Sequence, residues 1–251
     1  MDLVSVIIPY FRKKNTILLS IKSVLEQTYK NFEIIIVYDD ENESDWNFIK
    51  KFKKIDHRIS VIQNKENKGA GKSRNIGMRN SNGKFIAFLD ADDTWQSDKL
   101  SKQIEFMKLK NCDISHTSYA IVNKSQKVLG TRKARNFFDL NDLLKSCDIG
   151  TSTVIIKKHL INDNIQFASL TTKEDFVLWL KLLKQNRKIY GLKYQNDIEA
   201  IVCVAYTNEV PITVREMDYM SQVACQDGQC GKIAVAYTVW SRKRGAGREI
   251  I

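Results

Sequence analysis

The chain contains 251 residues, and no apolar run in it approaches the ~20 residues that a membrane-spanning helix needs. Residues 1–10, MDLVSVIIPY, lack both the basic start and the small-residue cleavage site of a secretory signal. We therefore expect a cytoplasmic protein, whose contact with a membrane would be peripheral and at the inner face.

Zinc-binding and disulfide motifs built on cysteine are also missing. The chain has five cysteines, none of them in a C-x-x-C pair, and its three histidines do not cluster near them. This spacing indicates neither a zinc site nor a disulfide framework. Reduced thiols are typical of a reducing compartment.

Positive charge is abundant, with a formal net charge of +11. Basic proteins often bind nucleic acid, anionic membrane surfaces or phosphate-bearing substrates. The lysines here are spread over many segments, which favours a solvated basic surface. We expect no nucleic-acid partner, while contact with an anionic membrane is compatible with the charge.

Hydrophobic periodicity alternates between strand and helix over the first 110 residues. Four short apolar runs are typical of buried strands: Val4–Pro9, Phe32–Val37, Arg58–Gln63 and Lys84–Leu89. Helical spacing follows each of them, over residues 17–25, 45–54, 70–80 and 97–107. This alternation predicts an α/β fold with a mostly parallel sheet covered by helices on both faces.

The alternation loosens after residue 112. We expect strands at Asp113–Val122 and Thr153–Lys157, and helices at Leu140–Cys147 and Phe176–Leu183. Beyond residue 195 the pattern changes again, and two further strands are expected at Ile198–Thr207 and Ile233–Trp240.

The stretch NKENKGAGKSRNIG, residues 64–77, contains Gly71-Lys72-Ser73 between an expected strand and an expected helix. A phosphate loop reads G-x-x-x-x-G-K-[ST], and counting back from Gly71 places Glu66 where the first glycine is needed. A carboxylate there would face the phosphates, which disfavours an NTP-hydrolysing enzyme. The alternative is that Arg74 on the helix orients an acidic group, or pairs with a neighbouring carboxylate to hold the helix.

Acidic side chains follow two of the expected strands. Asp39 and Asp40 come after the second strand, and Asp90, Asp92 and Asp93 come after the fourth. Ligands of open parallel sheets bind beyond the carboxyl ends of the strands. Residues two apart in an extended segment point the same way, so Asp90 and Asp92 could hold Mg²⁺ or Mn²⁺ together with substrate phosphates.

A third acidic pair, Glu174-Asp175, opens an expected helix. The helix dipole stabilises carboxylates at that position, so capping alone would explain the pair. Together with a metal–diphosphate site, Asp175 becomes a candidate general base for an acceptor hydroxyl.

Five ordered motifs of this sequence resemble those of the family 2 glycosyltransferases, which have the GT-A fold. They span about residues 3–195 and read VSVIIPYF, SIKSVLEQTYKNFEIIIVYDD, NKGAGKSRNIG, FIAFLDADDTW and KEDFVLWL. The resemblance implies a GT-A domain over 1–195, with a Rossmann-like nucleotide-sugar-binding half at 1–110 and an acceptor half at 111–195.

The same resemblance implies the roles of individual residues. The nucleotide-sugar site would comprise Pro9, Tyr10, Asp39, Asp40, Arg74, Asp90, Ala91 and Asp92. Asp92 and Asp90 would bind Mn²⁺ or Mg²⁺, and Asp175 would be the catalytic base with Glu174 beside it. The sequence departs from the family pattern at Tyr38, which takes the place of a usual aspartate. It also departs in the atypical segment 196–251.

The implied reaction is metal-dependent, inverting transfer of a hexosyl or N-acetylhexosaminyl group from a nucleotide-diphosphate donor, a UDP-sugar above all. The acceptor would be a hydroxyl of a saccharide or lipid-linked saccharide, in bacterial surface polysaccharide synthesis. The alternatives are a non-catalytic sugar-nucleotide-binding protein and, more weakly, a phosphate-loop NTPase.

Overall fold

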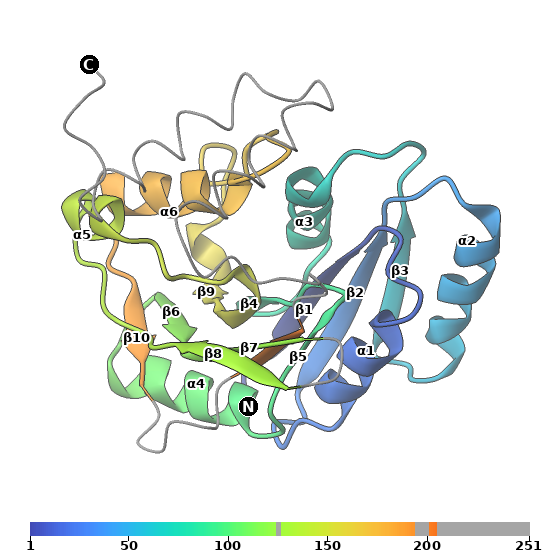
Figure 1. The fold of residues 1–251 in the computed structure, drawn as a ribbon, viewed down its shortest axis with the longest axis horizontal. Coiled ribbons are helices and arrows are strands. Elements are labelled where there is room, and N and C mark those ends of the chain that lie inside the picture. The colour runs from blue at the N-terminus through green and yellow to red at the C-terminus, as the bar shows by residue number, and fades with distance from the viewer. Residues whose placement is uncertain (124–126, 194–200, 205–251) are drawn as a thin grey trace.

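The computed structural model describes residues 1–123, 127–193 and 201–204. Their central feature is a seven-stranded sheet in the order β10-β6-β9-β4-β1-β2-β3 (Figure 1). Its strands are β1 (Val4–Tyr10), β2 (Phe32–Tyr38), β3 (Ile59–Gln63), β4 (Phe85–Phe88), β6 (Ile114–Thr117), β9 (Ile155–Lys157) and β10 (Tyr190–Leu192). All neighbouring pairs are parallel except those of β9, which runs antiparallel to both β4 and β6.

A second sheet of four strands has the order β5-β11-β7-β8. Its strands are β5 (Asp93–Thr94), β7 (Tyr119–Val122), β8 (Val128–Arg132) and β11 (Ile201–Val204). β11 lies between β5 and β7, antiparallel to the first and parallel to the second. The expected strand at 198–207 is thus described only at 201–204, and the one at 233–240 lies outside the described residues, so the boundary at residue 195 remains a prediction.

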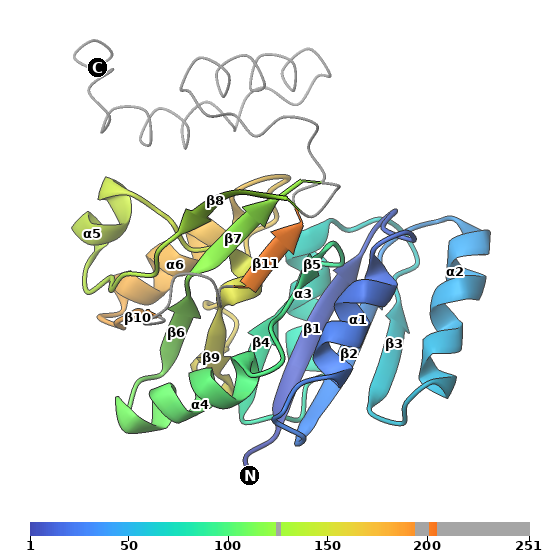
Figure 2. The same cartoon turned by 60° about the horizontal axis from the view of Figure 1, so that its bottom comes forward.

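Helices cover both faces of the large sheet (Figure 2). They are α1 (Ile17–Leu25), α2 (Glu43–Ile49), α3 (Ala70–Arg79), α4 (Lys99–Leu109), α5 (Leu140–Lys145) and α6 (Glu174–Lys184). Short 3₁₀ turns occur at Lys50–Lys54, Thr151–Thr153 and Lys158–Leu160. None of the helices in these described ranges is long and apolar enough to cross a bilayer.

The two faces of β1 belong to different hydrophobic cores, because successive side chains of a strand point to opposite sides. Val6 and Ile8 pack in a core with residues of α1 and α4. Ile7 packs in a second core with residues of α3 and α6. This layering confirms the predicted α/β fold with a mostly parallel sheet between helices.

Two expectations from the second half were wrong in detail. The predicted strand Asp113–Val122 is two strands, β6 and β7, which belong to different sheets on either side of Ser118. The start of the predicted strand Thr153–Lys157 is the end of a 3₁₀ turn, so the strand begins only at Ile155. The first segment mixes apolar and polar residues along its whole length, and the second is β-branched from Thr153 to Ile156, so local pattern cannot show where the chain changes layer or where the turn ends.

Gly77 allows α3 to lie directly on β1. A Cβ at this position would be 2.4 Å from Cγ2 of Ile7. We expect Gly77→Ala to lower the free energy of unfolding by about 1–3 kcal/mol, because the helix would have to move off the sheet. Urea denaturation measures this, with Gly130→Ala as the control, since a Cβ at Gly130 meets nothing within 4 Å. Equal stability of the two variants would contradict the close packing of α3 on β1.

Candidate active site

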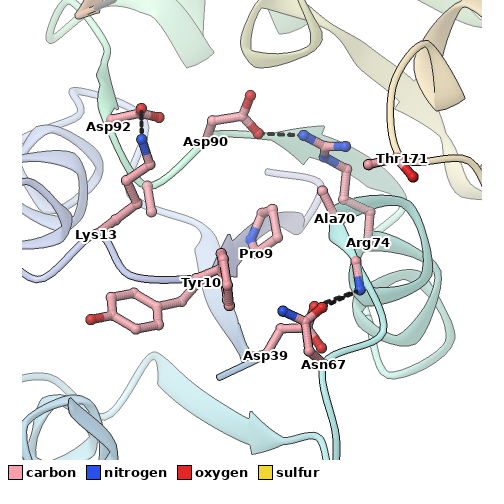
Figure 3. Close-up of a pocket in the computed structure, with 13 residues that line it drawn as sticks. Pro9, Tyr10, Lys13, Asp39, Asn67, Ala70, Arg74, Asp90, Asp92 and Thr171 are labelled. Carbon is pink, nitrogen blue, oxygen red and sulfur yellow. Dashed lines mark hydrogen bonds and ion pairs between the residues drawn. The ribbon is translucent and has the colours of Figure 1, made fainter. Parts of the chain in front are cut away.

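A pocket of about 550 Å³ lies where β1, β2 and β4 end (Figure 3). This edge of a parallel sheet is where α/β folds bind their ligands. The residues that line the pocket are Pro9, Tyr10, Phe11, Lys13, Asp39, Asn67, Gly69, Ala70, Arg74, Asp90, Ala91, Asp92 and Thr171. Seven of the eight residues predicted for the nucleotide-sugar site are therefore neighbours in one cavity, and the eighth, Asp40, is not among those that line it.

The acidic loop after β4 is fixed by contacts with the Thr151–Thr153 turn. The Asp90 N–H donates to the Ser152 hydroxyl at 3.0 Å, and that hydroxyl also bonds the Asp93 carboxylate. The indole N–H of Trp95 donates to the Ser152 carbonyl at 2.8 Å. The positions of Asp90 and Asp92 thus depend on a turn about 60 residues away.

Arg74 links this loop to the start of α6. Its guanidinium donates to Asp90 at 2.6 Å and to Glu174 at 2.7 Å, while its side chain is only 5% exposed. Burial by itself would lower the pKa of Arg74, but the two carboxylates outweigh it and raise the pKa above its ordinary value. Arg74 therefore stays charged and joins residues from three distant segments.

Asp92 has a different partner. The Lys13 ammonium, from the loop between β1 and α1, lies 2.6 Å from a carboxylate oxygen of Asp92. Figure 3 shows this pair beside the Asp90–Arg74 pair on one side of the pocket. Each of the two predicted metal ligands is thus ion-paired with a cationic side chain of the protein.

Asp39 holds the loop that precedes α3. Its carboxylate accepts hydrogen bonds from the Asn64 side chain at 2.7 Å and from the N–H groups of Lys68 and Gly69 at 2.8 Å each. Gly69 has φ +83°, a left-handed conformation that glycine adopts without strain. Asp40 instead accepts from the N–H groups after it and forms a local turn. Contact of either aspartate with a nucleotide sugar remains a prediction.

An aromatic stack supports the wall of the pocket. The rings of Tyr10 and Tyr38 are 5.3 Å apart and nearly parallel, and Trp46 packs against Tyr38 at 5.2 Å. The Tyr10 hydroxyl donates to Asp45 at 2.6 Å. Burial and the nearby carboxylates Asp40 and Asp45 raise the pKa of Tyr38 to about 12, so its hydroxyl stays protonated. Tyr38 therefore replaces a family aspartate with a neutral, stacked side chain.

The Gly71-Lys72-Ser73 sequence lies inside α3 and not in a loop. A Cβ on Gly71 would be 2.8 Å from the Ala168 carbonyl oxygen and 3.0 Å from Cγ of Glu174. The glycine is thus explained by close packing of the helix against the start of α6, and the segment does not wrap around an anion as a phosphate loop does.

Asp175 lies next to the pocket but does not line it. Its carboxylate accepts from the Thr151 hydroxyl at 2.9 Å and from the Phe176 N–H at 2.7 Å. The neighbouring Glu174 reaches the pocket through Arg74. Asp175 is thereby held by the Thr151–Thr153 turn and by the first turn of α6, and its catalytic role remains a prediction.

Sequence reasoning missed Lys13, Thr151, Ser152 and Thr171. None of them stands in a recognisable local motif, and each is placed by contacts that only the folded chain makes. Only the position of Lys13 could have suggested a place near the site, because it follows the first strand in the basic stretch FRKK.

The family model for glycosyl transferase family 2 matches residues 5–174. The chain belongs to this family. A relative in Escherichia coli, the UDP-Glc:alpha-D-GlcNAc-diphosphoundecaprenol beta-1,3-glucosyltransferase WfaP, is 39% identical over 196 residues, which are 78% of this chain and 74% of WfaP.

Solved structures share the fold of this family 2 chain. S. aureus TarS 1–349 in complex with UDP-GlcNAc superposes with a TM-score of 0.69 at 20% identity, over 97% of this chain and 72% of TarS. The mannosyltransferase PcManGT from Pyrobaculum calidifontis, in complex with GDP-Man and Mn²⁺, gives 0.62 at 13% identity, over 98% of this chain and 65% of PcManGT. These likenesses confirm the predicted GT-A-type architecture.

Proposed function

We propose that this family 2 chain is an inverting, metal-dependent enzyme that transfers a hexosyl or N-acetylhexosaminyl group from a UDP-sugar to an acceptor hydroxyl. The observation that carries the proposal is that Asp39, Arg74, Asp90 and Asp92 line one and the same pocket at the sheet edge. The UDP-Glc in the name of WfaP and the UDP-GlcNAc bound to TarS support a UDP-linked donor.

The acceptor in this proposal is a saccharide carried on a lipid, in the synthesis of a bacterial surface polysaccharide. The diphosphoundecaprenol in the name of WfaP supports a lipid-linked acceptor. An enzyme acting on such an acceptor would work on the cytoplasmic side, at the inner face of the membrane. The net charge of +11 favours contact with an anionic surface.

Asp92 and Asp90 fit a hard divalent cation, Mn²⁺ or Mg²⁺. Both face the pocket, and such cations are often bound by one or two carboxylates together with substrate phosphates. Among residues 1–123 and 127–193, no group of three or more His, Cys, Asp or Glu side chains is arranged to hold a metal ion. The donor diphosphate would therefore complete the coordination. The bound cation would neutralise charge on the departing diphosphate.

Other residues of the chain position the carboxylates and accept the proton of the acceptor. Arg74 holds Asp90 in place, and the Thr151 hydroxyl orients the Asp175 carboxylate. Asp175 takes the proton of the acceptor hydroxyl. The acceptor oxygen forms a bond to the anomeric carbon as the bond between that carbon and the diphosphate breaks. A single displacement of this kind inverts the anomeric centre.

Thermal unfolding of the protein with a panel of nucleotide sugars, with and without Mn²⁺, tests the proposal. A UDP-sugar at 100 times its Kd should stabilise the fold by about 2.7 kcal/mol, because it binds only the folded state. Asp92→Asn should remove the Mn²⁺-dependent part of this shift. The matched control is Asp163→Asn, an exposed aspartate that does not line the pocket. If no nucleotide sugar stabilises the protein with Mn²⁺ present, the proposed function is wrong.

A further inference from the structure

The two ion pairs of the acidic loop differ in how firmly they are held. Arg74 is buried and bonds both Asp90 and Glu174, so it is locked between two elements. Lys13 is 42% exposed and Asp92 is 22% exposed. Water screens a pair of this kind, which therefore holds together weakly and exchanges easily.

The partner of Asp92 matters because this carboxylate is also the proposed ligand of the cation. An ammonium group at 2.6 Å occupies one of its oxygens and would repel a divalent ion arriving there. Lysine carries its charge on a flexible four-carbon stem, so the ammonium can leave Asp92 while the backbone stays in place. Because Lys13 lines the same pocket, its charge would remain within reach of the donor phosphates.

We propose that Lys13 is an exchangeable counter-ion of Asp92, which gives up the carboxylate when the divalent cation binds and then pairs with the donor diphosphate. This inference rests on the proposed metal-dependent function. It assigns to Lys13 two effects of opposite sign, competition with the cation and attraction of the nucleotide. A lysine that only stabilised the β1–α1 loop would produce neither effect.

The first effect is tested by titrating Mn²⁺ into the protein without nucleotide and following free Mn²⁺ by electron paramagnetic resonance. Lys13→Met should bind Mn²⁺ about fivefold more tightly than the unchanged protein, because the competing charge is gone. Lys13→Arg should bind it no more tightly than the unchanged protein, since a guanidinium can hold a carboxylate with two hydrogen bonds.

Lys14→Met is the matched control. Lys14 is the next residue, is 43% exposed, and pairs with Asp45 at 3.1 Å, away from Asp92. Its removal changes the net charge by the same amount, so the Mn²⁺ Kd of Lys14→Met should stay within about twofold of the unchanged protein, because salt screens the distant charge.

The second effect is tested by UDP binding at saturating Mn²⁺, measured by calorimetry. Lys13→Met should bind UDP about tenfold more weakly, whereas Lys14→Met should not change the Kd, because only the first variant loses a charge inside the pocket. If Lys13→Met leaves both constants unchanged while Asp92→Asn abolishes Mn²⁺-dependent UDP binding, the inference about Lys13 fails and the proposed function stands. If the unchanged protein binds no Mn²⁺ even with UDP, both fail.

Discussion

Replacing Arg74 by alanine is expected to lower the free energy of unfolding by about 3 kcal/mol. Removing one partner of a buried ion pair leaves the other charge unpaired in a poorly solvated place, which costs about 3–5 kcal/mol. The lower end applies because Asp90 is 34% exposed and water can solvate it, whereas Glu174 is 12% exposed. Urea denaturation followed by tryptophan fluorescence measures the loss.

Two further variants separate the ion pairs from helix propensity. Lys72→Ala removes a cation from an exposed position of the same helix, and its stability should stay within about 0.5 kcal/mol of the original. Arg74→Lys keeps the charge but not the fork of donors that reaches two carboxylates, so its loss should be intermediate. An Arg74→Ala protein as stable as Lys72→Ala would show that Arg74 does not tie α3 to the loop after β4.

The first 110 residues could be predicted closely because each element there carries its own pattern. Phe32–Val37 is apolar except for Glu33, as is typical of a strand buried on both faces, and the strand β2 extends this prediction by one residue to Tyr38. The segment Asp45–Lys54 was predicted as one helix, but α2 begins at Glu43 and continues as a 3₁₀ turn from Lys50. Periodicity predicted that this segment is helical. It did not predict the change from α-helical to 3₁₀ hydrogen bonding, which depends on packing.

The existence of β9 was predicted, but its antiparallel direction and its neighbours could not be. It pairs with both β4 and β6, which lie far from it in the sequence. A short β-branched run predicts a strand but not its direction or its neighbours, because both are settled by tertiary contacts. The edge strands β5, β8 and β10 have still weaker local patterns and were not predicted.

The candidate site, too, was predictable only where its residues belong to a regular element. The location of residues at strand ends, such as Asp39 and Asp90, could be predicted, because the carboxyl ends of parallel strands lie at one edge of the sheet. The contacts that hold Asp39, Asp90 and Asp92 in place could not be predicted. They are side-chain hydrogen bonds and ion pairs with Asn64, Ser152 and Lys13, and such contacts have no sequence period. The Lys13–Asp92 ion pair, from which the metal competition is inferred, is therefore visible only in the folded chain.

Replacing Asp175 by asparagine is expected to lower kcat for sugar transfer by about 10²–10⁴-fold. This is the range that a positioned general base contributes, and an amide cannot take the acceptor proton. The fold should be kept, because an asparagine side-chain oxygen can still accept from the Thr151 hydroxyl or the Phe176 N–H. Steady-state transfer from the UDP-sugar found by thermal unfolding measures kcat, and urea denaturation checks the fold.

A variant of the neighbouring threonine distinguishes loss of the base from loss of its orientation. Thr151→Val keeps the Asp175 carboxylate and removes only the hydroxyl that orients it, so kcat should fall less than in Asp175→Asn. If Asp175→Asn keeps more than a tenth of the kcat, the proton goes to another group. If the unchanged protein binds the donor with Mn²⁺ but turns over no acceptor, the non-catalytic sugar-nucleotide-binding protein becomes the better description of this family 2 chain.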